Sequence, residues 1–288
     1  MTRAKATAVG FIAVLLWALL ALFTVGSAPT PPLMLNALCF TIGGTLGVVW
    51  AIATGEWRAL RSIPLKVYLF GSLSLFGYHA LYFSALRLAP AAEAGLIAYL
   101  WPLLIVLMSG LLPGERLRAG HLFGACLGFL GAALIIGGGG LGFNPTHLPG
   151  YGLALACAFT WSSYSVLSRR LGDIPTVSVV VFCLATAVLS TLLHIALEDT
   201  VWPADMLTWV SVFALGLGPV GLAFYVWDVG VKRGDIQLLG TASYAAPLLS
   251  TLALVGAGFA EPTIHLGAAA LLITGGAVLA TRASLKSG

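Results

Sequence analysis

Three side chains that can donate and accept hydrogen bonds lie within one apolar stretch: Tyr78, His79 and Tyr82. Tyr78 and Tyr82 are four residues apart, which places both phenols on one face of a helix. His79 lies eight residues before Arg87, or about 12 Å along a helix, and still further from Lys66. Polar groups at such depth usually face a cavity or a neighbouring helix. His79 is therefore interpreted as a group that binds substrate or a proton, with a structural hydrogen bond to another helix as the alternative.

Further aromatic residues fall deep within other apolar stretches. They are Trp17, Trp101, Trp161, Tyr164, Phe224 and Tyr225. Trp and Tyr usually gather at membrane interfaces, so an interior group needs another explanation. Aromatic walls with hydroxyl, indole and imidazole donors suit a flat, apolar ligand that has a polar end. We predict that these residues contact substrate, while packing within the membrane core remains the alternative for some of them.

Two Tyr-x-x-Pro motifs, Tyr99–Pro102 and Tyr244–Pro247, occupy the middle of two apolar stretches. A proline inside a helix cannot donate a backbone hydrogen bond, so the carbonyl four residues earlier loses its partner. The freed carbonyls would be those of Ala98 and Ser243. We predict that both tyrosines contact substrate and that both prolines act as hinges. A kink that serves packing alone is the alternative.

The elements that must position these side chains are membrane-spanning helices. The chain has 288 residues, of which 59% are hydrophobic and only 8% are charged, whereas soluble domains are about 25% charged. This composition excludes a soluble enzyme, a nucleic-acid-binding protein and a disordered chain. A bilayer core needs about 20 apolar residues for each helical crossing. Ten stretches satisfy this requirement: Ala6–Gly26, Leu33–Ala53, Val67–Leu86, Ala91–Leu112, Leu117–Gly137, Tyr151–Ser168, Thr176–Leu197, Leu207–Val231, Ile236–Phe259 and Leu266–Thr281.

The charges between these stretches predict the orientation. With a cytoplasmic N-terminus, 13 of the 14 basic residues fall on the inner side, and only Arg87 falls outside. The inner set is Arg3, Lys5, Arg58, Arg61, Lys66, Arg116, Arg118, Arg169, Arg170, Lys232, Arg233, Arg282 and Lys286. The acidic residues Glu198, Asp199, Asp205 and Glu261 fall on the outer side. The positive-inside rule therefore predicts a multi-pass protein of the cell (inner) membrane with both termini in the cytoplasm, and the basic charge needs no nucleic-acid partner.

The two halves of the chain match each other when one is shifted by about 144 residues. The matched pairs are Trp17 with Trp161, Pro31 with Pro175, Cys39 with Cys183, Trp57 with Trp202, Gly71 with Gly216, Tyr99 with Tyr244, and Pro102 with Pro247. Each copy holds five spans, so the second must enter the membrane from the opposite side. We therefore predict one all-α transmembrane domain, residues 1–288, built from inverted repeats at 1–144 and 145–288. Inverted repeats are typical of secondary transporters, although a purely structural duplication is the alternative.

This pattern resembles the drug/metabolite transporter superfamily, and within it the EamA-type exporters. The resemblance rests on the five-plus-five repeat, a Trp in each first helix, the two Tyr-x-x-Pro motifs, and Glu115 and Glu261 just before each fifth helix. It covers the whole chain and implies transport rather than enzymatic activity. Members of the superfamily export amino acids, metabolites or drugs, or carry nucleotide sugars and triose phosphates.

The absence of deep charges narrows the substrate. The first span has no carboxylate, unlike the small multidrug branch, and no Lys or Arg lies at mid-membrane to bind a phosphate. Within the family, this favours an exporter of aromatic amino acids or similar small amphipathic metabolites that works by alternating access. Export of other metabolites or drugs is the alternative, and an intramembrane enzyme or a passive channel would belong to a different class. We expect neither a cofactor nor a metal, because Cys39, Cys126, Cys157 and Cys183 lie inside spans without CxxC spacing.

Three groups near the ends of spans receive structural interpretations. Asp228 precedes Lys232 by one turn and is interpreted as its partner in an ion pair at the cytoplasmic edge, with Trp227 as an interfacial anchor. His194 and Glu198 are interpreted in the same way at the outer edge. The small-residue faces Gly43-x-x-x-Gly47 and Gly124-x-x-x-Gly128 would pack helices within one chain rather than between two. We therefore expect a monomer.

Overall fold

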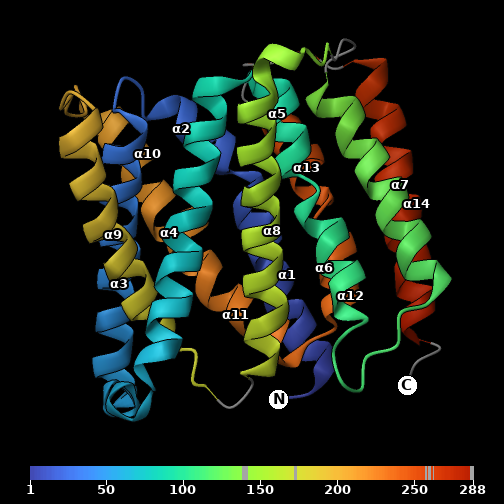
Figure 1. The fold of residues 1–288 in the computed structure, drawn as a ribbon, viewed down its shortest axis with the longest axis horizontal. Coiled ribbons are helices and arrows are strands. Elements are labelled where there is room, and N and C mark those ends of the chain that lie inside the picture. Colours follow the sequence, from blue (N-terminus) through green and yellow to red (C-terminus); the bar gives the residue numbers. More distant parts are fainter. Residues whose placement is uncertain (138–141, 172–173, 257, 259–260, 262, 286–288) are drawn as a thin grey trace.

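A computed structural model describes residues 1–137, 142–171, 174–256, 258, 261 and 263–285. Phe259 and Lys286, at the predicted end of the ninth span and in the predicted inner set, lie outside these residues. The described chain is a bundle of helices (Figure 1). Nine helical stretches within it are long and apolar enough to cross a membrane. The remaining predicted span, Tyr151–Ser168, is α8 (Leu148–Arg170), whose second half is more polar because it carries four serines and two arginines.

The first half supplies five spans. They are α1 (Arg3–Ala18) with α2 (Leu20–Gly26), α3 (Pro32–Thr54), α4 (Leu65–Leu88), α5 (Ala91–Ala98) with α6 (Trp101–Ser109), and α7 (Ala119–Ile136). A short 3-10 helix, η1 (Glu56–Ser62), connects α3 to α4, and another, η2 (Pro145–His147), precedes α8.

The second half repeats this order. After α8 come α9 (Ser178–Leu197), α10 (Met206–Leu217) with the π-helical turn η3 (Gly218–Leu222) and α11 (Ala223–Arg233), α12 (Ile236–Ala242) with α13 (Ala245–Gly256), and α14 (Ile264–Leu285). In Figure 1, α1 starts at the lower end of the bundle, whereas α8 starts at the upper end. The two five-span repeats are therefore inverted relative to each other, as predicted.

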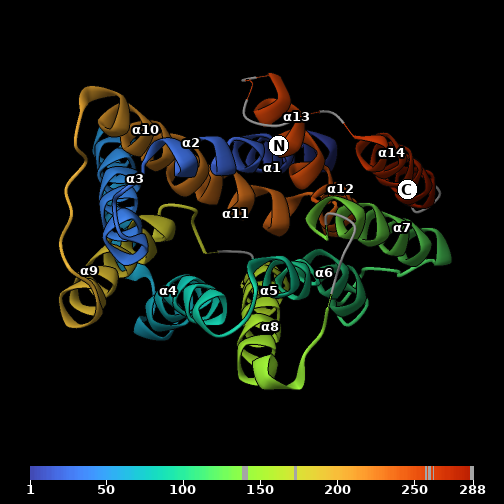
Figure 2. The same cartoon turned by 90° about the horizontal axis from the view of Figure 1, so that it is seen from above.

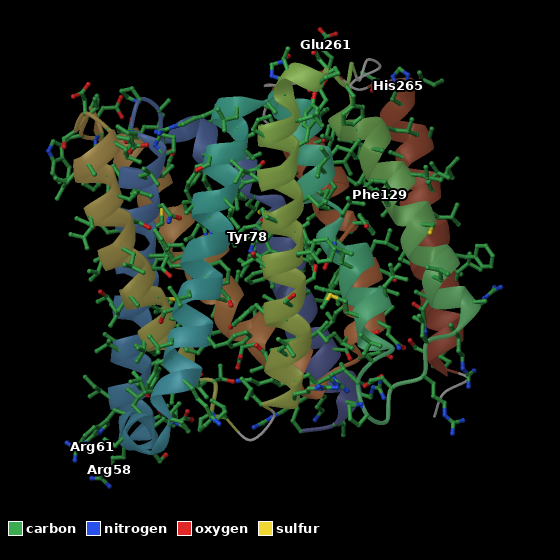
Figure 3. All side chains as sticks on the ribbon, in the orientation of Figure 1. Arg58, Arg61, Tyr78, Phe129, Glu261 and His265 are labelled. Carbon is green, nitrogen blue, oxygen red and sulfur yellow. The ribbon has the colours of Figure 1, made fainter. Side chains whose placement is uncertain are left out.

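Charged residues gather at both ends of the bundle, which we name by a residue at each. Arg58 and Arg61 lie at the same end as Arg3, whereas Glu261 and His265 lie at the opposite end (Figures 1 and 3). These are called the Arg3 end and the Glu261 end below. Tyr78 lies about midway between them (Figure 3).

Two of the four interrupted spans contain the predicted prolines. The break between α5 and α6 falls at residues 99–100, just before Pro102, and the break between α12 and α13 falls at 243–244, just before Pro247. The Leu103 N–H, which follows Pro102, donates to the Tyr244 hydroxyl at 3.1 Å. One expectation was wrong: the Ser243 carbonyl is not free, because it accepts the Ala246 N–H at 3.1 Å in a tight turn.

The other two interruptions face each other. The first span breaks at Leu19, whose N–H donates to the Leu16 carbonyl at 3.0 Å, and the eighth span widens into the π-turn η3 around Pro219. The Trp17 indole donates to the Pro219 carbonyl at 3.1 Å and so joins the two broken spans. Broken helices leave backbone groups that need partners at membrane depth, and here a side chain of the opposite repeat satisfies one of them.

The small-residue faces serve packing within the chain, which confirms that interpretation. A Cβ added at Gly43 would collide with Gly221, and one added at Gly124 would collide with the Gly276 carbonyl. Close approach of backbones through glycine is the usual way in which helices associate in lipid. α7 and α14, which carry Gly124 and Gly276, pack side by side along their length (Figures 1 and 2).

Candidate functional site

Four tryptophans meet at the centre of the bundle, and two of them are equivalent positions of the two repeats. Trp17 of α1 and Trp161 of α8 place their ring centroids 5.9 Å apart. Trp101 of α6 lies 5.9 Å from Trp17, and Trp227 of α11 lies 5.1 Å from it. Phe224 packs against Trp161 at 5.7 Å. We call Trp17, Trp101, Trp161 and Trp227 the tryptophan cluster.

The indole N–H groups of the cluster divide into two kinds. Trp17 donates to the Pro219 carbonyl, and Trp227 donates to the Ser165 hydroxyl at 3.1 Å. The indoles of Trp101 and Trp161 have no hydrogen-bond partner among the described residues. The first pair therefore joins helices, whereas the second pair has indole N–H donors that no described residue accepts.

Three tyrosines with unpartnered hydroxyls border this cluster. Tyr78 and Tyr82 stack with centroids 6.4 Å apart, and Tyr78 lies 5.5 Å from Trp161. The Tyr99 phenol, at the break between α5 and α6, is close enough to both to interact electrostatically. All three side chains are partly exposed, and their hydroxyls make no hydrogen bond to any described residue. We call Tyr78, Tyr82 and Tyr99 the tyrosine group.

His79 adds a hydrogen-bond acceptor to the same region. Its Nδ1 lies 2.8 Å from the Leu75 carbonyl oxygen. A carbonyl can only accept, so Nδ1 carries the proton, and in the neutral ring Nε2 presents a lone pair. Phe40 of α3 and Phe224 hold the ring edge-on, with centroids 5.0 and 6.2 Å away. His79 is thus bonded to its own helix rather than to a neighbouring one, and its second nitrogen remains available.

Two residues of this region were not predicted as site residues. Phe40 stacks on Phe224 at 5.4 Å, and no feature of its position in the sequence signals this contact. Trp227 is completely buried in the tryptophan cluster, so its interpretation as an interfacial anchor was wrong. The Gly-Pro-Val-Gly run that forms η3 could have revealed the displacement of α11, because such a sequence rarely continues a straight helix.

Three residues that were predicted to contact substrate lie apart from the tyrosine group and His79. Tyr164 stacks between Trp161 and Phe70 on the far side of the cluster. Tyr225 donates its hydroxyl to the Gly43 carbonyl at 3.1 Å. Tyr244 is fully buried, with its hydroxyl bonded to the Leu103 N–H. In this conformation the ring of Tyr164 and the hydroxyls of Tyr225 and Tyr244 form contacts between helices.

The predicted ion pairs are present, and one of them is shielded from solvent. Lys232 contacts Asp228 at 2.8 Å, which confirms the pair. Both side chains are buried, 5% and 1% exposed, and the Lys232 ammonium also donates to the carbonyl of Ile174, which lies between α8 and α9, at 3.0 Å. Thr176 also donates to the Asp228 carboxylate at 2.8 Å. At the Glu261 end, His194 lies 3.0 Å from Glu198 as predicted.

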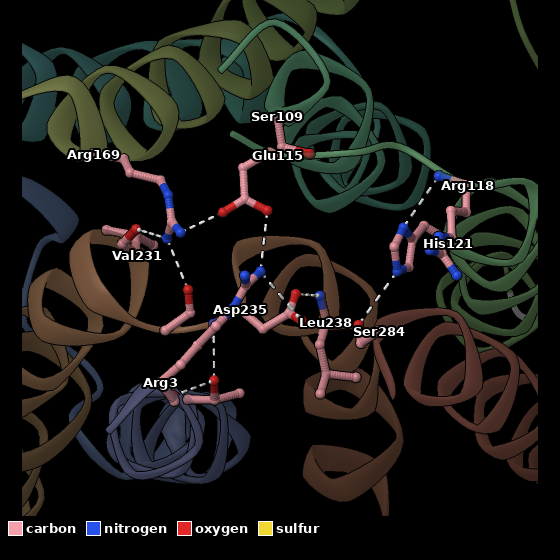
Figure 4. Close-up of polar contacts among 12 residues, drawn as sticks. Arg3, Ser109, Glu115, Arg118, His121, Arg169, Val231, Asp235, Leu238 and Ser284 are labelled. Atoms are coloured by element: carbon pink, nitrogen blue, oxygen red, sulfur yellow. Dashed lines mark hydrogen bonds and ion pairs between the residues drawn. The ribbon is translucent and has the colours of Figure 1, made fainter. Parts of the chain in front are cut away.

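An ion-pair network closes the bundle at the Arg3 end (Figure 4). Glu115, which precedes α7, accepts from Arg3 at 3.0 Å and from Arg169 of α8. Arg169 also donates to the carbonyls of Val231 and Gly234 at 3.0 and 2.7 Å. Both repeats contribute, so we call Arg3, Glu115 and Arg169 the closing network.

A different set of contacts joins the helices at the Glu261 end. Arg87 of α4 binds Glu198 at 3.2 Å, and Glu198 also accepts the N–H groups that begin α3. These contacts join α4 to its neighbours α3 and α9. α2 packs against α1, α10 and α13, whereas α5 packs against α4, α7 and α8. In the described chain, no extensive contact joins α2 to α5 above the tryptophan cluster.

Comparison with known proteins gives a consistent set of relatives. The EamA-like transporter family matches the chain twice, over residues 4–137 and 148–282. A protein of Ancylobacter novellus named aromatic amino acid exporter YddG is 56% identical over 283 residues, covering 98% of each chain. The protein of the same name in Escherichia coli (strain K12) is 27% identical over 292 residues, covering 97% of each. A crystal structure with 55% sequence identity superposes with a TM-score of 0.95 and covers 99% of both chains.

Proposed function

We propose, on the premise that this chain belongs to the EamA-like transporter family, that it is a secondary transporter that exports aromatic amino acids by alternating access. Its site would bind the substrate between the two repeats, among the tryptophan cluster, the tyrosine group and His79. The two named relatives that cover the whole chain support the choice of substrate. Similar small amphipathic metabolites would satisfy the same site.

The observation that carries this proposal is a set of unpartnered polar groups beside an aromatic wall. The hydroxyls of the tyrosine group can donate to a carboxylate, and His79 Nε2 can accept from an ammonium. Hydrogen bonds to charged groups contribute about 1.5–3 kcal/mol each, so several can offset part of the desolvation of a zwitterion. The substrate ring would pack against Trp161 and Phe224, which bury aromatic surface without requiring a counter-charge.

The residues named for the candidate site carry no formal charge, and from this we expect selectivity for zwitterions over cations and phosphate esters. The buried charges of Asp228 and Lys232 already pair with each other. A cationic drug or a phosphate ester would therefore carry an uncompensated charge into the membrane, at a cost of several kcal/mol. A zwitterion brings its own opposite charge, which explains why an amino acid is favoured over both.

Orientation and conformational state follow from the same reasoning. We propose that the protein lies in the inner membrane with both termini in the cytoplasm, because basic residues concentrate at the Arg3 end. The closing network then seals the cytoplasmic side, and the site opens toward the outside. A rocking motion that breaks the network and brings α2 and α5 together would expose the site to the cytoplasm. Because the glycine faces are used internally, we propose that a monomer performs this cycle.

Counterflow in proteoliposomes tests the proposal. Purified protein would be reconstituted with internal unlabelled L-phenylalanine, and uptake of radiolabelled L-phenylalanine, L-tryptophan or L-arginine would be followed. We expect transient accumulation of both aromatic amino acids and none of arginine. Equal accumulation of arginine, or no saturable accumulation of any aromatic amino acid, would contradict the assignment.

A further inference from the structure

A cavity of about 720 Å³ lies away from the tryptophan cluster, between α3, η1 and α11 at the Arg3 end. Its inner wall is Tyr225, whose ring meets Trp50 of α3 at 6.0 Å. Nothing in the proposed transport cycle uses this space.

Two stripes of side chains line the cavity, and both change from apolar to charged in the same direction. From the last residue of η3 through α11, Leu222, Val226, Val229 and Arg233 lie at spacings of four, three and four residues, which puts them on one helix face. Along α3, Leu46 and Trp50 lead to Glu56 at the start of η1. The cavity therefore has an apolar interior and a mouth that carries one acid and one base.

The stripes fit within one leaflet of a membrane. Leu222 and Arg233 are eleven residues apart, or about 16 Å along the helix axis, and the oblique course of α11 (Figure 1) makes their separation across the membrane shorter than this. Half of a bilayer core is about 15 Å thick. Val49 and Ile52, on the neighbouring surface of α3, are 60% and 64% exposed, as expected for side chains that face lipid.

The mouth lies at the depth of lipid headgroups. Trp57 of η1 is 38% exposed, and the guanidinium groups of Arg58 and Arg61 lie 5.7 and 5.4 Å from its ring centroid. An exposed tryptophan flanked by arginines is typical of the membrane interface. Glu56 and Arg233, beside this anchor, form no ion pair with each other or with another described residue.

We propose that this cavity binds one phospholipid of the leaflet at the Arg3 end, with a headgroup that carries both a phosphate and a primary ammonium. Arg233 would bind the phosphate, and Glu56 would accept hydrogen bonds from the ammonium. One acyl chain would lie along the two stripes beneath Tyr225. Such a ligand carries opposite charges at one end, which can pair with Glu56 and Arg233, and a long apolar tail, which can cover the apolar stripes. A free amino acid would leave most of the apolar stripe uncovered.

Native mass spectrometry of the delipidated protein would measure retention of added phosphatidylethanolamine. Phosphatidylcholine, which has no ammonium N–H, and phosphatidylglycerol, which has no ammonium, would serve as matched lipids. We expect one tightly retained phosphatidylethanolamine per chain, and about fivefold weaker retention of either other lipid, as for the loss of an exposed ion pair. Equal retention of all three lipids would overturn the proposal, and so would displacement of the bound lipid by millimolar L-phenylalanine.

Three substitutions locate the lipid. Glu56→Gln and Arg233→Gln should each weaken retention about fivefold, and Val229→Trp should weaken it further by narrowing the apolar part of the cavity. Arg282→Gln, an exposed arginine of α14 away from the cavity, should leave retention unchanged. Glu56 and Arg233 are exposed, so their variants are expected to fold, and unaltered thermal midpoints without lipid would verify this. Full retention by both variants would overturn the proposal.

Discussion

Removal of the negative charge of Glu115 is expected to open the Arg3 end of the bundle. The Glu115 side chain is 5% exposed and binds Arg169, which is 18% exposed, and Arg3, which is 49% exposed. Loss of one partner from a buried pair costs about 3–5 kcal/mol. Because Arg169 keeps two carbonyl acceptors and Arg3 already contacts solvent, we expect about 2 kcal/mol for Glu115→Gln.

This penalty applies only where the closing network exists. When the Arg3 end is open, water solvates the same arginines, so the substitution leaves that conformation nearly unchanged. A difference of about 2 kcal/mol shifts the equilibrium about thirtyfold toward the open conformation.

A buried cysteine beside the network would report this shift. Ser109, at the end of α6, is fully buried and lies near Glu115 (Figure 4). In membrane vesicles that expose the Arg3 end, a membrane-impermeant maleimide should label Ser109→Cys up to about thirtyfold faster when Glu115→Gln is added. The control is Arg116→Gln, because Arg116 is exposed and forms no ion pair with a described residue. A labelling rate that Glu115→Gln leaves unchanged would refute the role of the network in closure.

Three further predictions concern packing and buried polar groups; stability is measured as the thermal midpoint of unfolding in detergent, and transport as counterflow in proteoliposomes. Gly276→Ala should destabilise the protein by about 1–3 kcal/mol because the new Cβ meets the backbone of α7, whereas Gly275→Ala, in open space, should have little effect. Equal midpoints for these two variants would contradict the close packing of α7 and α14. Tyr244→Phe should cost about 1–3 kcal/mol because it leaves a backbone N–H without a partner, while Tyr99→Phe should retain stability and lose transport. The reverse pattern would show that the roles of the two repeats are exchanged. Asp228→Asn should cost about 3 kcal/mol because it leaves a buried lysine without its counter-charge, and an unchanged midpoint would mean that this lysine is hydrated.

The sequence predicted the spans and the core of the candidate site because both depend on local patterns. Apolar length and basic loops define ten crossings without any knowledge of packing. Tyr78 and Tyr82 lie on one helical turn, so their stacking follows from a spacing of four residues. Trp17 and Trp161 were matched through the repeat, and a two-fold relation between the repeats brings equivalent central residues together.

The wrong predictions concerned how deeply a side chain is buried and which distant group accepts or donates its hydrogen bond. Counting residues from Lys232 placed Trp227 near the surface, but α11 runs obliquely (Figure 1) and turns the Trp227 ring into the tryptophan cluster. Trp227 is consequently buried. Hydrogen-bond partners depend on distant segments, so the engagement of Tyr225 with Gly43 could not be read from either local sequence. The same limit applies to Ser243, whose carbonyl is satisfied by an unpredicted turn.

Equilibrium binding of L-phenylalanine to the purified protein tests the central claim most directly, namely that neutral groups recognise both charged ends of an aromatic zwitterion. Competition by phenethylamine, which lacks the carboxylate, and by 3-phenylpropionate, which lacks the ammonium, would be compared with competition by L-tryptophan. We predict that L-tryptophan competes well and that both one-charged analogues compete at least about tenfold less well, since each loses a charge-assisted hydrogen bond and its internal counter-charge. Competition by phenethylamine or 3-phenylpropionate as strong as that by L-tryptophan would contradict the account.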